Sequence, residues 1–92
     1  MLALKIYPEA VKFISSLRGK QAGQISIKVF DLLKNLMPGD SEGLKGTAGG
    51  YRRVDVGEFR IVYRVVEESL EIPLVGRRND DEIYKQVKRK GL

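Results

Sequence analysis

A single glycine, Gly57, constrains the fold of this chain more than any other residue. Val56-Gly57-Glu58-Phe59 has the pattern of a two-residue type II′ turn, because glycine can take the positive φ that the first central position requires. A two-residue turn also sets the register of the strands on either side of it. The predicted pairs are Val56 with Phe59, Asp55 with Arg60, Val54 with Ile61, and Arg53 with Val62.

This register divides the hairpin into two unlike faces, because successive side chains of a strand point to opposite sides. One face is apolar and carries Val54, Val56, Phe59, Ile61, Tyr63 and Val65. The other face carries Tyr51, Arg53, Asp55, Arg60, Val62 and Arg64. We expect the apolar face to be buried and the arginine-rich face to stay partly open.

A second turn is expected at Glu68-Ser69, which places Arg77 opposite Arg60. With this turn, Leu70, Ile72 and Leu74 join the apolar face, and Glu71, Val75 and Arg77 join the other face. Pro73 interrupts the last strand, and proline cannot donate a hydrogen bond to a sheet. It therefore marks an edge or a bulge.

The remaining periodicities predict strands at 2–6, 51–56, 59–66 and 70–77 and helices at about 8–17, 21–37 and 80–90. Pro8 suits the first position of a helix, and Asn79 with Glu82 has the pattern of a capping box. Residues 38–50 contain five glycines and are expected to form a loop.

The predicted order is β-α-α-β-β-β-α in a single domain that covers residues 1–92. An antiparallel sheet with an apolar face is most economically covered by two helices packed on that face. The fold class is therefore α+β, a small two-layer domain with a mainly antiparallel sheet.

Composition excludes several kinds of site. The chain has 92 residues, a formal charge of +5, no cysteine and no histidine. Disulfides, thiolate metal sites and the commonest general base are therefore excluded, and no cofactor or metal is expected. No apolar run reaches transmembrane length, and the start lacks the layout of a signal peptide, so a cytoplasmic protein without a membrane partner is expected. The basic charge favours nucleic acid or an acidic protein as partner.

Arg53, Arg60, Arg77 and Arg78 form a predicted basic patch, with Tyr84 one turn into the helix that follows. Guanidinium groups hold phosphate oxygens in paired hydrogen bonds and stabilise charge that develops on a phosphate. A tyrosine can stack on a base or take part in proton transfer. These residue types together are typical of RNA cleavage without a metal ion.

A purely structural interpretation of the same residues stays open. Arginines on an outer sheet face are usually solvated, and Asp55 opposite Arg60 is the pattern of a cross-strand ion pair that contributes about 0.2–1 kcal/mol. The ring of Tyr84 can also cover the end of the apolar core with its hydroxyl in water.

Three blocks of this sequence resemble the RelE/ParE superfamily of toxins from toxin–antitoxin modules. They are Leu44-Lys45-Gly46, then residues 51–63, then Val75-Gly76-Arg77-Arg78-Asn79 through Ile83-Tyr84. The resemblance implies a compact toxin that a cognate antitoxin holds inactive in a hetero-oligomer. RelE-type members cut mRNA in the ribosomal A site, whereas ParE-type members poison DNA gyrase.

The resemblance also implies roles for single residues. RelE-type toxins have basic or tyrosine residues at positions that match Arg53, Arg60, Arg78 and Tyr84, which are the expected catalytic residues. Arg53 and Arg60 are expected to hold the scissile phosphate and Arg78 the leaving oxygen, while Tyr84 orients the base or accepts the 2′-proton. The further expected substrate-binding residues are Arg52, Arg77, Lys45 and Asp55.

Two departures from the RelE pattern keep alternatives open. Asp55 stands where a second basic residue is common, and Arg77 stands where lysine or histidine is frequent. Arginine does not give up its proton in proteins, so it is a poor proton shuttle. The alternatives are a gyrase inhibitor of the ParE type, a catalytically disabled homologue that still binds an antitoxin, and an unrelated basic adaptor domain.

Overall fold

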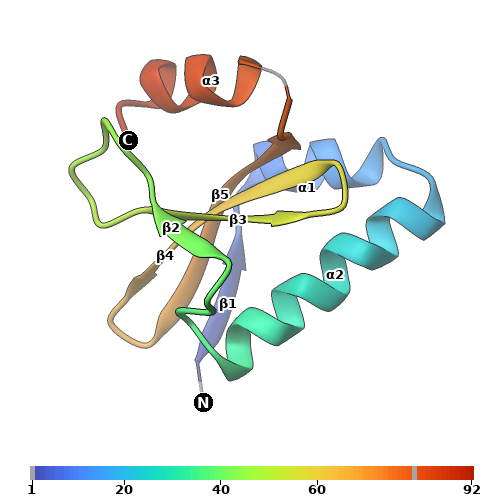
Figure 1. Ribbon diagram of the computed structural model, residues 1–92, viewed down its shortest axis with the longest axis horizontal. Coiled ribbons are helices and arrows are strands. Elements are labelled where there is room, and N and C mark those ends of the chain that lie inside the picture. The colour runs from blue at the N-terminus through green and yellow to red at the C-terminus, as the bar shows by residue number, and fades with distance from the viewer. Residues whose placement is uncertain (1, 80) are drawn as a thin grey trace.

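The computed structural model describes residues 2–79 and 81–92. The elements follow in the order β1 (Ala3–Ile6), α1 (Pro8–Ser15), α2 (Gly19–Lys34), β2 (Ser41–Gly43), β3 (Arg52–Val56), β4 (Phe59–Val66), β5 (Ser69–Arg77) and α3 (Glu82–Lys90). The strands form one sheet in the order β1-β5-β4-β3-β2, in which only the β1–β5 pair is parallel. The predicted α+β fold with a mainly antiparallel sheet is confirmed (Figure 1).

The first hairpin has the predicted turn and register. Gly57 has a φ of 57°, and Glu58 beside it is not among the residues with positive φ, as a type II′ turn requires. All four predicted pairs between β3 and β4 are present, including Asp55 with Arg60.

The second hairpin differs from the prediction in two ways. Its turn residues are Glu67 and Glu68, because Val66 pairs with Ser69. The register then shifts between Val62 and Arg64, where two residues of β5, one of them Pro73, lie opposite one residue of β4. The proline has no N–H to give to the ladder, so a bulge at this point costs little.

The bulge reverses the faces of the residues that follow it. Arg60 lies opposite Gly76, and Arg77 lies opposite Phe59, so the predicted pairing of Arg77 with Arg60 is wrong. For the same reason Val75 belongs to the core cluster that was expected to hold Leu74, and Leu74 belongs to the opposite cluster.

The sheet is covered on both faces, so the molecule has two cores. The larger core lies under α1 and α2, as predicted, and contains Ala10, Ile25, Val29, Leu32, Val54, Phe59, Ile61, Tyr63, Leu70, Ile72 and Val75. The smaller core lies under α3 and contains Leu44, Tyr51, Val62, Leu74, Ile83 and Val87. Figure 1 shows α2 and α3 on opposite sides of the sheet. The arginine-rich face is therefore partly closed by α3.

The connection between α2 and β3 contains a short strand that was not predicted from the sequence. Residues 38–50 were expected to be a loop, but Ser41–Gly43 forms the edge strand β2 beside β3. Serine, glutamate and glycine have little strand preference, so sequence pattern did not reveal it. Helix α2 also ends at Lys34, earlier than expected, and the Met37 N–H donates to the Asn35 side chain.

The last helix begins later than the capping pattern suggested. Helix α3 starts at Glu82, with Asp81 at its N-cap position and no side-chain cap hydrogen bond, so Asn79 is not the N-cap. The predicted first residue of this helix, Asp80, lies outside the described residues. Ile83 and Val87 face the sheet, as predicted.

We predict that Gly57→Ala lowers the free energy of unfolding by about 1 kcal/mol, because a side chain at this positive φ strains the turn. There is room for the methyl group itself, since the nearest atom to an added Cβ, on Gln24, is 3.5 Å away. Urea denaturation measures the change. Gly39→Ala is the matched control, because it lies in open space without positive φ; equal losses in the two variants would contradict the explanation.

Candidate functional site

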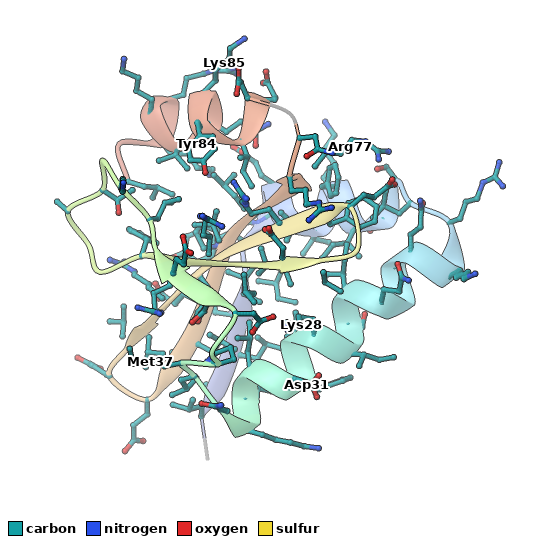
Figure 2. All side chains as sticks on the ribbon, in the orientation of Figure 1. Lys28, Asp31, Met37, Arg77, Tyr84 and Lys85 are labelled. Atoms are coloured by element: carbon teal, nitrogen blue, oxygen red, sulfur yellow. The ribbon has the colours of Figure 1, made fainter. Side chains whose placement is uncertain are left out.

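Arg60 of β4 lies at the centre of the predicted site and contacts two other residues of that site, Tyr84 and Asp55. Its Nη1 donates to the Tyr84 hydroxyl at 2.6 Å, and its Cζ is 5.8 Å from the centre of the tyrosine ring. On its other edge, Nε and Nη2 donate to the two carboxylate oxygens of Asp55 at 2.8 and 3.2 Å. Figure 2 shows Tyr84 between α3 and the sheet, with Lys85 on the outer side of the helix.

The packing of α3 explains why Tyr84 reaches Arg60. Ile83 and Val87 are buried one helical turn apart and hold one side of α3 against the sheet. Ile83 packs on Gly76, with its side chain 3.5 Å from where a Cβ on that glycine would lie. Gly76 is the cross-strand partner of Arg60, so this contact brings α3 directly beside the arginine.

Arg53 of β3 lines a cleft next to Tyr84. The cleft has a volume of about 240 Å³, and its walls are Glu42, Gly43, Leu44, Lys45, Arg53 and Tyr84. Nη2 of Arg53 donates to the carboxylate of Glu42 at 2.6 Å, and Glu42 is itself exposed. The cleft is therefore open to solvent and bordered by two cations, one carboxylate and an aromatic ring, and the cations and the ring suit a phosphate and a base.

Arg78 follows β5 and lies on the same side. Its backbone N–H donates to the carbonyl of Glu58 at 3.0 Å, which extends the sheet past the end of the strand. Its charge is close enough to Asp55 to help lower the pKa of that carboxyl. The structure gives the Arg78 side chain no hydrogen bond or ion pair with any described residue, so its donors are available to a ligand.

Two residues expected to bind substrate lie on the opposite face of the sheet. The guanidinium of Arg52 donates to the carbonyl and hydroxyl of Ser41 at 3.3 and 2.9 Å. Arg77 pairs with Glu58 at 2.9 Å and lies over the ring of Phe59. Figure 2 shows Arg77 well away from Tyr84. The structure therefore brings Arg53, Arg60, Arg78, Tyr84, Lys45 and Asp55 together and leaves Arg52 and Arg77 out.

The contacts of Asp55 and Arg60 with each other and with their neighbours determine how both residues ionise. The hydrogen bond from Arg60 lowers the pKa of Asp55, and the charges of Arg53 and Arg78 add to this effect against the opposing effect of burial. The hydrogen bond to Asp55 raises the pKa of Arg60, and Tyr84 adds to it. Both groups are ionised at neutral pH, so Arg60 can bind an anion but cannot transfer a proton.

One charged wall of the cleft, Glu42, was not predicted from the sequence. Glu42 pairs with Arg53 only because β2 lies beside β3, and that strand was not predicted. The nearest motif in the sequence was the block of residues 44–46. It indicated that Lys45 belongs to the site, but it did not indicate the strand that brings Glu42 there.

Two kinds of feature are not found in the part of the chain that the structure describes. Its acidic side chains form no group of three placed to hold a metal ion. Its helices also include none that is long and apolar enough to cross a membrane.

We predict that Asp55→Asn destabilises the protein by about 1 kcal/mol at neutral pH and by less in acid. The folded-state pKa of Asp55 lies below its ordinary value of 3.8. Its ion pair with Arg60 therefore stabilises the fold fully above that value, and this stabilisation is lost as the pH falls through the folded-state pKa. Urea denaturation at about pH 6 and about pH 2.5 measures the difference between wild type and variant; a difference that grows in acid would contradict the assignment.

Comparison with known proteins identifies the fold. No protein-family model matches the sequence, and no curated protein matches it. Solved structures do match. The isolated RelE toxin of E. coli superimposes with a TM-score of 0.73 at 19% identity, over 100% of both chains. A chain of the archaeal RelE–RelB complex of Pyrococcus horikoshii OT3 gives 0.72 at 23% identity, over 84% of this chain and 94% of that one.

A third match is the YoeB dimer of Staphylococcus aureus, with a TM-score of 0.65 at 25% identity over 78% of this chain and 91% of the other. Each of these similarities extends over most of both chains, so it concerns the whole architecture rather than one motif. The resemblance that the sequence motifs indicate is thus confirmed in three dimensions: the chain has the fold of the RelE-type toxins.

Proposed function

We propose that this protein is the toxin of a toxin–antitoxin module, a metal-independent endoribonuclease that cleaves mRNA in the ribosomal A site. Such an activity inhibits translation and takes place in the cytoplasm. The observation that carries the proposal is the contact between Arg60 and Tyr84 at 2.6 Å, beside the cleft that Arg53 and Lys45 line. This arrangement supports the proposal, because basic side chains of the kind that binds phosphate lie next to a ring that can stack on a base or exchange a proton.

The proposed reaction uses the RNA's own nucleophile. The 2′-oxygen of the ribose attacks the neighbouring phosphorus, the bond from phosphorus to the 5′-oxygen breaks, and the products are a 2′,3′-cyclic phosphate and a 5′-hydroxyl. The 2′-proton passes to water, either directly or through the Tyr84 hydroxyl, which takes it up as it releases its own proton, and the departing 5′-oxygen takes up a proton from water. The step therefore balances without an oxidant, a reductant or a metal ion.

The three arginines share two tasks in this reaction. Arg53 and Arg60 hold the oxygens of the scissile phosphate, where negative charge grows as the 2′-oxygen attacks. Arg78, whose side chain makes no hydrogen bond or ion pair with another described residue, donates hydrogen bonds to the departing oxygen. Because no histidine is present, positioning of the substrate by the ribosome supplies much of the rate enhancement.

A cognate antitoxin is the proposed protein partner. The matched chain from Pyrococcus horikoshii comes from a RelE–RelB complex, and a chain of a RelB–RelE antitoxin–toxin complex from Methanococcus jannaschii also matches. The shared fold supports the same kind of toxin–antitoxin hetero-oligomer for this chain.

We expect Arg60→Ala and Tyr84→Ala each to reduce mRNA cleavage by about 100-fold, because each removes a group that acts on the reacting phosphate or its nucleotide. Primer extension on mRNA from induced cells measures the cleavage. Arg18→Ala is the matched control, since Arg18 is exposed at the start of α2, far from Tyr84 in sequence and on the other side of the sheet. Full toxicity of both site variants would disprove the nuclease assignment.

The cellular target is tested by inducing the protein alone in a bacterial host and following labelled amino acid and thymidine over the first minutes. We expect amino-acid incorporation to fall first and the Arg78→Ala variant to restore it, because Arg78 acts on the leaving oxygen. Arrest of thymidine incorporation first would indicate a gyrase inhibitor. Continued growth of the wild-type strain would indicate a disabled toxin.

A further inference from the structure

We propose that Asp55 is a positioning residue, which holds the guanidinium group of Arg60 so that its free edge faces the scissile phosphate. This inference rests on the proposed nuclease function and assigns to Asp55 a role different from substrate binding. It also explains why an acidic residue lies among arginines that are expected to bind an anion.

The hydrogen bonds of Arg60 divide its guanidinium group into two parts. An arginine has five N–H donors in a fixed plane. Asp55 accepts from Nε and Nη2, and the Tyr84 hydroxyl accepts from Nη1. One donor is left on each of the two terminal nitrogens, and two donors on adjacent nitrogens are suited to the oxygens of a phosphate.

The backbone makes this arrangement rigid. Asp55 and Arg60 are directly opposite each other in the β3–β4 hairpin, whose register the Gly57 turn sets. Both side chains are mostly buried, with 29% of Asp55 and 12% of Arg60 exposed. A free arginine loses much of its rotamer entropy when it is fixed. In this protein the carboxylate already fixes Arg60 in the absence of RNA. The entropy cost of ordering the arginine is therefore not added to the free energy of the reaction.

The carboxylate also lets three arginines gather. Arg60, Arg53 and Arg78 all lower the pKa of Asp55, which means that all three charges are close to it. Without the carboxylate these like charges repel one another, and Arg60 is free to turn into the cleft or out to solvent. Loss of Asp55 therefore adds net positive charge to the site but leaves the Arg60 side chain without a fixed orientation.

These two effects act on different kinetic constants. More positive charge strengthens RNA binding and lowers KM, whereas loss of orientation weakens contacts made in the transition state and lowers kcat. If the carboxylate only weakened the basic patch, its removal would speed the reaction, and kcat would rise instead of falling. An ion pair that serves only the fold changes neither constant once the protein is folded.

The test measures the steady-state kcat and KM for cleavage of mRNA on purified bacterial ribosomes by the wild type, Asp55→Ala, Asp55→Asn, Arg60→Ala and the double variant Asp55→Ala/Arg60→Ala. Circular dichroism at the assay temperature verifies that each variant is folded. Glu58→Ala is the matched control, because it removes the same charge from the other face of the sheet, where Glu58 pairs with Arg77.

For Asp55→Ala we expect a fall in kcat of at least about tenfold with an unchanged or lower KM. Asp55→Asn restores part of the rate, because its amide oxygen still accepts one hydrogen bond from Arg60, and Glu58→Ala stays within about twofold of the wild type. In the Arg60→Ala background the loss of Asp55 has almost no further effect, because the residue acts through Arg60.

Three results would overturn the inference. An equal or higher kcat in Asp55→Ala would make the carboxylate a weakening charge or a structural one. Full additivity in the double variant would mean that Asp55 does not act through Arg60. A folded wild-type protein that cleaves no mRNA on ribosomes would reject the proposed nuclease function itself, which separates that failure from the other two.

Discussion

The contact between Asp55 and Arg60 joins the fold of this protein to its site. The two residues are opposite each other only because the Gly57 turn sets the register of β3 against β4. The same register places Val54 and Ile61 in the larger core, on the reverse side of the sheet. One local conformation therefore determines both which side chains are buried and which charged groups meet, so the site cannot shift without disturbing the core beneath it.

Much of this arrangement follows from the sequence because its causes are local. The turn at Gly57, the pairing of Asp55 with Arg60 and the inward side of α3 depend on residues close in sequence and on simple alternation. The side of the sheet on which Arg77 lies could not be predicted from nearby residues and alternation. It depends on how the bulge at Pro73 is accommodated, and a shift of one residue moves every later side chain to the other face.

The cleft depends on a different kind of information. Its wall at residues 42–45 is in place because a three-residue edge strand pairs with β3, and nothing in Ser41-Glu42-Gly43 favours a strand by itself. Tertiary pairing imposes this strand. The sequence could therefore indicate the arginines and the tyrosine of the site, but not the carboxylate of Glu42 that pairs with Arg53.

Helix α3 holds the tyrosine of the site with few buried contacts. The helix has two buried residues, Ile83 and Val87, in the smaller of the two cores. An element with few buried apolar contacts opens at a lower free energy than the rest of the fold. Arg60 is fixed from the sheet side by Asp55, whereas Tyr84 is fixed only as long as α3 stays docked. The site is thus built from a rigid half on the β3–β4 hairpin and a more weakly held half on α3, and its complete geometry exists only when both are in place.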